Sequence, residues 1–287
     1  MTNPVFSNSD IFGDPKDRKN GARGGVSTQP APGGSGYGQA ASFGTAGAVV
    51  TDAATLDQMY GAPTATTRDT GRLTYDDVIV KTGGLLALLV AVAAVTWVVA
   101  PELWIFGAIV GLVLGLVNAF RKSPSPLLIT LYTVAQGVFL GGISAFYESY
   151  YDGIVGQAVL ATLSVFAVSL FLFKSGRVRV TPKFTKMLLL GMVGYLVYSL
   201  VNVVLMLFGV GGGEFGPLRS GWLGVGVGLI AVALAAMSLV LDFDSIKRGV
   251  DAGVPAKWAW SAAFGLIVTL VWLYLELLRL LAILRGE

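Results

Sequence analysis

Three carboxylates and one guanidinium lie in or beside long apolar stretches of this sequence. Asp242 and Asp244 end one apolar stretch, and Glu276 and Arg279 lie deep within the next. A charge near the centre of a membrane-spanning helix is costly unless it is paired, hydrated or used in function. These residues are therefore the candidate functional groups of the chain.

We expect Asp244 and Glu276 to face each other if both lie on the inner side of a helix bundle. Two carboxylates at close range cannot both remain ionised at low cost, so such a pair shares a proton near neutral pH. The ionised pair also offers oxygen ligands to a hard cation such as Ca²⁺, as a weak and transient site. With Asp242 as a near alternative to Asp244, the pair is a candidate pH-sensing gate.

The same residues can also be explained without a role in gating. Glu276 and Arg279 are three residues apart, so they share a helix face and can form a local ion pair. Asp242 and Asp244 can instead be solvated at the membrane surface, beside basic residues one turn later. Gln136, on an earlier apolar stretch, either lines a pathway or forms a hydrogen bond between helices.

The composition of the whole chain indicates which kind of structural element carries these residues. Hydrophobic residues make up 54% of its 287 residues, charged residues 13%, and the mean hydropathy is +0.72. A soluble domain carries roughly 25% charge. Each apolar stretch has the roughly twenty residues that cross a bilayer. These stretches cover about 78–100, 103–120, 127–146, 154–173, 187–210, 222–241 and 258–284.

The sequence thus predicts an all-α polytopic membrane protein with a bundle of about seven transmembrane helices over residues 73–287. Thr74 and Asp77 have the spacing of a capping box and mark the start of the first helix. Residues 1–72 are rich in Gly, Ser, Ala, Thr and Pro, and we expect a disordered polar tail there. Glycines that recur every four residues from Gly107 are typical of close helix packing in lipid.

The charges in the connections between these stretches predict how the chain lies in the membrane. Basic residues gather in alternate connections, at Arg121 and Lys122 and again between Lys174 and Lys186. The positive-inside rule then puts the N-terminus in the cytoplasm, in a multi-pass protein of the plasma membrane. The same placement accounts for the net charge of +3 without a nucleic-acid partner.

The chain contains no Cys and no His. Their absence excludes a thiol nucleophile, a histidine proton relay and a zinc site of the usual ligands. We therefore expect neither an enzyme nor a cofactor. An intramembrane hydrolase is poorly supported, because a lone pair of Asp residues lacks the usual protease motifs.

Four segments, in this order, resemble the Bax inhibitor-1 family (transmembrane Bax inhibitor motif proteins), in its bacterial branch with a long polar N-terminal tail. They are Leu73-Thr-Tyr-Asp-Asp-Val, Gln136-Gly-Val-Phe-Leu-Gly-Gly-Ile-Ser, Leu241-Asp-Phe-Asp-Ser-Ile and Leu273-Tyr-Leu-Glu-Leu-Leu-Arg-Leu-Leu. The resemblance covers about residues 73–287. It implies a fold of seven helices in which a central helix is wrapped by the others.

In family members described as pH-sensitive calcium leaks, two aspartates on the sixth and seventh helices share a proton and govern the pore. By its place in the motif, Asp244 resembles the first, with Asp242 as the near alternative, and Glu276 stands where the second would be. This chain departs from the pattern in having Glu in place of Asp. It also has Gln136 where the family often has Glu.

Two functions of different classes follow. The first is a pH-modulated passive cation leak, with calcium as the expected ion, gated by the carboxylate pair. The alternative is an interaction or scaffold protein that restrains other membrane proteins, such as a membrane protease, through its tail and helices. Deleting the tail separates them, because a leak should survive the deletion and a scaffold that acts through the tail should not.

Overall fold

The computed structural model describes residues 71–210 and 216–286. Within these ranges the chain has seven helices long and apolar enough to cross a membrane, as the sequence predicts, and no strand. They are α3 (Tyr75–Val99), α4 (Trp104–Phe120), α5 (Pro126–Tyr150), α6 (Ile154–Lys174), α7 (Pro182–Leu207), α8 (Gly221–Asp251) and α9 (Ala259–Gly286). Short 3-10 helices, Pro101–Leu103 and Ala256–Trp258, precede α4 and α9. Residues 1–70 of the predicted disordered tail, 1–72, lie outside the described ranges; Arg72 forms a backbone bridge with Pro255.

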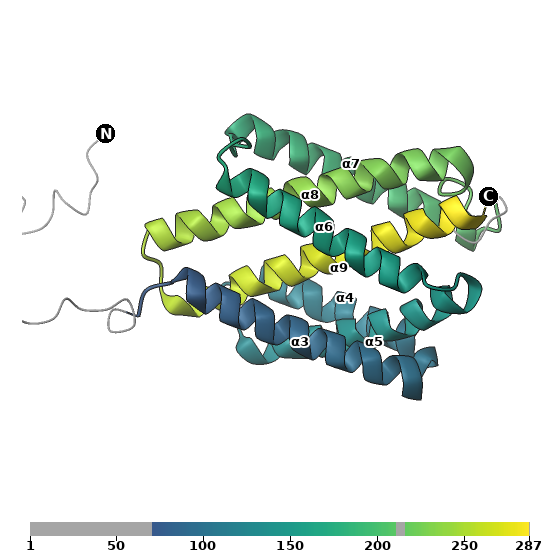
Figure 1. Ribbon diagram of the computed structural model, residues 1–287, viewed down its shortest axis with the longest axis horizontal. Coiled ribbons are helices and arrows are strands. Elements are labelled where there is room, and N and C mark those ends of the chain that lie inside the picture. Colours follow the sequence, from purple (N-terminus) through teal and green to yellow (C-terminus); the bar gives the residue numbers. More distant parts are fainter. Residues whose placement is uncertain (1–70, 211–215, 287) are drawn as a thin grey trace, which may run out of the picture. The chain divides into compact units, whose positions relative to one another are not determined.

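The last helix, α9, runs through the middle of the bundle, with α3, α5, α6 and α8 packed around it (Figure 1). Among the described spans it buries the largest share of its residues. α4 packs against α5, and α7 packs against α8 on the outside of the bundle. The central helix implied by the family resemblance is therefore α9.

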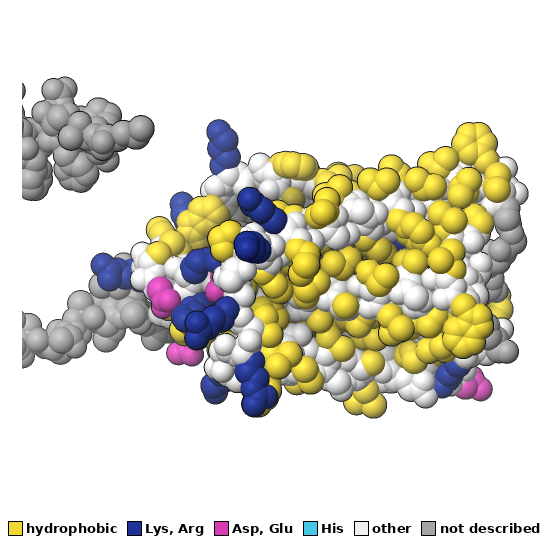
Figure 2. Space-filling model, turned by 90° about the horizontal axis from the view of Figure 1, so that it is seen from above, with side chains coloured by type: hydrophobic (Ala, Val, Ile, Leu, Met, Phe, Trp, Pro, Cys, Tyr) yellow, Lys and Arg dark blue, Asp and Glu magenta, His cyan; other side chains and the backbone are white. Residues whose placement is uncertain are grey.

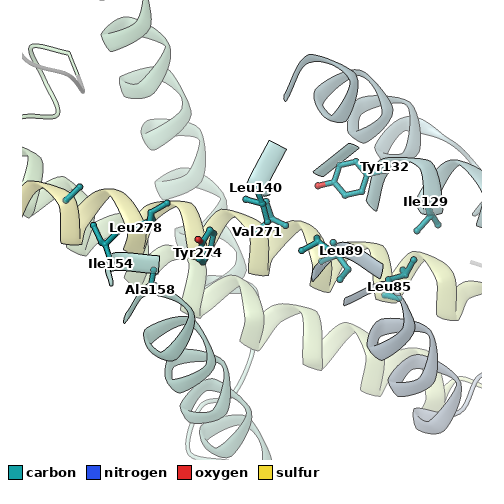
Figure 3. Packing of buried hydrophobic residues seen from close by; sticks show 13 residues of the cluster. Leu85, Leu89, Ile129, Tyr132, Leu140, Ile154, Ala158, Val271, Tyr274 and Leu278 are labelled. Atoms are coloured by element: carbon teal, nitrogen blue, oxygen red, sulfur yellow. The ribbon is translucent and has the colours of Figure 1, made fainter. Parts of the chain in front are cut away.

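A hydrophobic core joins α9 to α3, α5 and α6. Figure 3 shows its side chains, which include Leu85 and Leu89 of α3, Leu140 of α5, Ile154 and Ala158 of α6, and Val271, Tyr274 and Leu278 of α9. Ile154, Ala158 and Leu278 are fully buried. Burial of this apolar surface holds the three neighbouring helices against α9.

Glycines let α5 approach its neighbours closely. A Cβ atom at Gly141 would overlap the carbonyl oxygen of Ala93 in α3, and one at Gly142 would overlap that of Pro101. On α4, a Cβ atom at Gly107 would lie 2.6 Å from the backbone nitrogen of Phe139. The glycine repeat that begins at Gly107 therefore serves helix packing, as predicted.

Helix ends differ from the prediction mainly at α8, which continues ten residues beyond the predicted end at 241 and stops at Asp251. The charged residues end the apolar stretch but are compatible with a helix, so they do not end the helix itself. Gly253, with a φ of 62°, terminates it in the left-handed conformation that glycine adopts readily. Asp242 and Asp244 thus lie inside α8 rather than after it.

The start of the first span agrees with the sequence. The Thr74 hydroxyl accepts a hydrogen bond from the Asp77 backbone nitrogen at 3.1 Å, and Asp77 accepts one from the Thr74 nitrogen at 3.3 Å. The predicted capping box is confirmed. It directs α3 into the bundle from the end of the molecule where α8 stops.

The two ends of the bundle differ in charge. Figure 2 shows a broad hydrophobic surface over the length of the helices, with most Lys and Arg side chains gathered at one end. We call this the basic end; it comprises residues 71–75, 120–126, 174–182 and 251–259. The opposite end comprises residues 99–104, 150–154, 207–210 and 216–221, together with 286.

Candidate functional site

A buried ion pair lies on α9 toward the opposite end. Arg279 donates a hydrogen bond from Nη2 to Oε2 of Glu276, three residues earlier on the same helix. Only 5% of Glu276 and 7% of Arg279 is exposed. The local pairing that the sequence left open is therefore present.

Glu276 has two further partners, of which one belongs to a different helix. Tyr195 of α7 donates its hydroxyl proton to Oε1 of Glu276, and Trp272 donates its indole N–H to the same oxygen at 3.3 Å. The rings of Tyr195 and Trp272 lie 5.8 Å apart between centroids. The carboxylate thus links α7 to α9.

A second arginine reaches the site from the connection between α7 and α8. Arg219 donates from Nη2 to the Tyr195 hydroxyl at 2.8 Å and to the hydroxyl of Ser199. Its guanidinium carbon lies 5.2 Å from the centroid of the Tyr195 ring, in cation–π contact. We call these six residues the Glu276 cluster: Tyr195, Ser199, Arg219, Trp272, Glu276 and Arg279.

Helical spacing assembles most of the cluster. Trp272, Glu276 and Arg279 follow one another at intervals of four and three residues, which puts them on one face of α9. Tyr195 and Ser199 are four residues apart on α7. The loop that carries Arg219 is held by Leu218, whose nitrogen donates to the Asn202 side chain at 3.0 Å. Two helices and a loop therefore position the charges.

The electrostatic balance of the cluster is one carboxylate against two guanidinium groups. The Nε atoms of Arg219 and Arg279 are buried and have no hydrogen-bond partner among the described residues. Removing one partner of a buried ion pair leaves an uncompensated charge, at a cost of about 3–5 kcal/mol. The carboxylate is thus tightly held, and the net positive charge opposes a cation at this point.

The two candidate aspartates of α8 have other partners. Asp244 forms an ion pair with Arg248 on the same helix, at the basic end, and 59% of the Arg248 side chain is exposed. Asp242 accepts a hydrogen bond from the Thr269 hydroxyl of α9 at 2.8 Å. Among the described residues, no cationic side chain lies within ion-pair distance of Asp242.

The structure does not bring Asp244 and Glu276 together, so the expectation that they face each other at close range is wrong. α8 and α9 are antiparallel, with Asp242 beside Thr269. Glu276 lies seven residues beyond Thr269, and Asp244 two residues beyond Asp242 in the other direction. At about 1.5 Å per residue, the two carboxylates are separated by about 13 Å along the helices.

The packing of small residues sets this register. A Cβ atom at Gly228 would lie 3.0 Å from Leu280, and one at Gly224 would lie 3.1 Å from Ile283. These contacts fix α9 against α8 with Glu276 away from Asp244. The roles of both residues in gating remain predictions.

Gln136 lies elsewhere in the bundle. It is 9% exposed, and its amide nitrogen would lie 2.7 Å from a Cβ atom at Gly111 of α4. Its carbonyl oxygen has no hydrogen-bond partner among the described residues. Gln136 therefore faces α4 and takes no part in the hydrogen bonds of the Glu276 cluster.

Sequence reasoning missed four residues that complete these contacts: Tyr195, Arg219, Thr269 and Trp272. Arg219 carried one signal, because it is a basic residue in a connection that otherwise holds Glu214. Tyr195 carried none, since its hydroxyl resembles that of any tyrosine on an apolar helix. In the described part of the chain, no three Asp or Glu side chains gather as a metal site would require.

Seven apolar helices, with charged groups paired inside the bundle, define a multi-pass integral membrane protein. A family model described as Bax inhibitor 1 like matches residues 3–286, so the chain belongs to this family. The comparison with curated proteins finds no match. Members of the family are embedded in membranes and are not known as enzymes.

Proposed function

We propose that the chain is a pH-modulated passive leak for cations, with Ca²⁺ as the favoured ion. The observation that carries this proposal is the buried carboxylate of Glu276, which is held from two helices by Arg279 and Tyr195. A charge at this depth is costly to maintain, and its use as a contact for a passing cation gives a reason for it. The arrangement described here then represents the closed state.

Other polar groups between α8 and α9 support a route for the ion. Asp242 and Thr269 lie closer to the basic end than Glu276. Asp244 lies nearer the basic end, but Arg248 neutralises its charge, so it contributes little to the attraction of cations. A cation would meet single carboxylates in turn, which fits weak and transient binding.

The Glu276 cluster explains why the described arrangement would block the passage of cations. Arg279 neutralises the carboxylate, and Arg219 adds a positive charge that repels cations. α7 packs against α8 on the outside of the bundle, so a shift of α7 would withdraw Tyr195 from Glu276. The cluster would then lose the link between α7 and α9. Oε1 of Glu276 would keep only its donors on α9, Trp272 and Arg279, and would be more open to a cation.

Asp242 provides the dependence on pH. Its only described polar partner is the Thr269 hydroxyl, so no cation stabilises its charge. Protonation at low pH removes the negative charge that attracts the ion. Flux should therefore rise as the pH rises, and Asp242→Asn should flatten this dependence.

The direct test is Ca²⁺ flux into liposomes that contain the purified chain, over buffers from mildly acidic to mildly alkaline. We expect flux above that of protein-free liposomes, rising with pH in the wild type and nearly constant with pH in Asp242→Asn. Flux equal to that of protein-free liposomes at every pH would overturn the leak. The alternative role as an interaction protein for other membrane proteins would then be preferred.

We further propose that the basic end faces the cytoplasm and that the membrane is the plasma membrane. The gathering of Lys and Arg at that end supports this orientation. Since the chain has no Cys, Ser175→Cys at the basic end and Ser149→Cys near the opposite end are matched single-cysteine variants. An impermeant thiol reagent added to intact cells should label Ser149→Cys only; labelling of Ser175→Cys alone would reverse the orientation.

A further inference from the structure

A lateral groove lies between α3 and α6, on the side of the bundle away from the Glu276 cluster. It has a volume of about 360 Å³, and its floor is formed by α5 and α9. Figure 3 shows three of its floor residues, Leu140, Val271 and Tyr274, and Leu89 of the α3 wall. The floor is buried, whereas wall residues such as Val90 and Leu163 are 61% and 56% exposed. The groove therefore opens sideways, onto a surface that faces the membrane.

The length of the groove matches one leaflet of a bilayer. Its walls extend from Leu86 to Trp97 on α3 and from Phe166 to Val155 on α6. Each wall comprises twelve residues, and the eleven steps between its ends cover about 16 Å at the rise of an α-helix. The hydrocarbon core of a bilayer is about 30 Å thick, so one leaflet contributes about 15 Å.

The two ends of the groove lie at the depths that the two ends of a bound acyl chain require. Trp97 and Val155 lie near the opposite end of the bundle, where α3 ends and α6 begins. Tryptophan is enriched at the level of lipid headgroups. Leu86 and Phe166 lie toward the middle of the spans, where the ends of acyl chains meet.

The chemistry of the lining favours hydrocarbon over water. It contains three hydroxyl groups, and each already has a partner. Ser144 and Tyr274 share a hydrogen bond of 2.7 Å, and Thr162 donates to the carbonyl oxygen of Ala158 at 2.7 Å. A buried water needs two to four polar partners, and these hydroxyl groups are engaged with the protein.

We propose that the groove binds one acyl chain of a phospholipid from the leaflet at the opposite end of the bundle. The chain enters beside Trp97, runs between α3 and α6, and ends near Leu86. The hydroxyl pair of Ser144 and Tyr274 stays bonded beneath it. This site is separate from the cation route and does not depend on it.

Photocrosslinking of the wild-type chain tests the proposal without any substitution. The protein is placed in vesicles of phosphatidylethanolamine and phosphatidylglycerol that contain a trace of phosphatidylcholine with a diazirine in the middle of one acyl chain. Mass spectrometry should find several-fold more label on Leu163 than on Leu196 of α7, which is at least as exposed. Equal labelling of the two positions would overturn the proposal.

A matched pair of variants tests where the lipid chain lies. Ala94 lines the groove, and Ala91 is exposed on the same helix outside it. Ala94→Phe should reduce the label on Leu163 several-fold, and Ala91→Phe should leave it unchanged. An undiminished label in folded Ala94→Phe would contradict the site, and the wild-type comparison still decides if that variant does not fold.

Discussion

The two sides of α9 contrast in chemistry. Toward α3, α5 and α6 the helix presents Ile267, Val271 and Leu278, all buried among apolar neighbours. Toward α7 and α8 it presents Thr269 and Glu276, which bind polar side chains of both helices. One side of the central helix holds the bundle together, and the other carries the charges on which our proposed function rests.

The two sides of α9 also differ in how they contact the neighbouring helices. On the apolar side, α3, α5 and α6 pack on α9 through a buried core, and α5 approaches α3 so closely at Gly141 that a methyl group would not fit. On the polar side, α7 meets Glu276 through the long side chain of Tyr195. Tight backbone packing resists displacement, whereas a side-chain hydrogen bond can be exchanged. We therefore expect α7 to move more readily against α9 than α3 or α5.

The largest effect on stability should come from Arg279→Met. This change leaves the Glu276 carboxylate buried without its cation, so we expect a loss of about 3–5 kcal/mol in the free energy of unfolding. Thermal unfolding in detergent, followed by circular dichroism, measures it. The double variant Glu276→Gln/Arg279→Met should be more stable than Arg279→Met alone. Equal stability of these two variants would show that the ion pair is not what the arginine maintains.

A single methyl group added on the apolar side should lower the free energy of unfolding nearly as much. In Gly141→Ala the added Cβ atom overlaps the Ala93 carbonyl, and we expect a loss of about 3 kcal/mol. Gly156→Ala is the matched control, because nothing lies within 4 Å of its added Cβ atom. The control should gain up to about 1 kcal/mol from helix propensity. Similar unfolding temperatures for both variants would contradict the close contact between α5 and α3.

Tyr195→Phe should have a smaller effect on stability and a distinct effect on transport. It removes the hydrogen bond to the charged Glu276, which contributes about 2 kcal/mol. Since this bond links α7 to α9, its loss should also raise Ca²⁺ flux into liposomes. Tyr198→Phe is the control on the same helix, because the Tyr198 hydroxyl binds the Leu218 carbonyl instead. An equal rise in flux in both variants would argue against a specific link through Glu276.

Local features of the sequence predicted much of this architecture. The apolar stretches gave the seven spans, and the spacing of Thr74 and Asp77 gave the first helix start. The three-residue spacing of Glu276 and Arg279 allowed for the ion pair that the structure contains. Each of these depends on neighbours within one or two helical turns.

Contacts between distant helices could not be predicted in the same way. The register that separates Asp244 from Glu276 depends on how Gly228 packs against Leu280, and nothing in the spacing along α8 reveals it. Tyr195 and Glu276 are 81 residues apart in the chain. Their contact depends on how α7 packs on α8. The apolar surfaces of these two helices do not specify one arrangement.

We infer that Glu276 acts through its link to α7 and not through a pair with Asp244. Ca²⁺ flux into liposomes, measured over a range of pH for Glu276→Gln and Asp244→Asn, distinguishes these two possibilities. We predict that folded Glu276→Gln loses most of its flux at every pH, because the deep carboxylate is gone. Asp244→Asn should keep at least half of the wild-type flux and the same pH dependence. Equal loss of flux and of pH dependence in both variants would show instead that Asp244 and Glu276 act as a coupled pair.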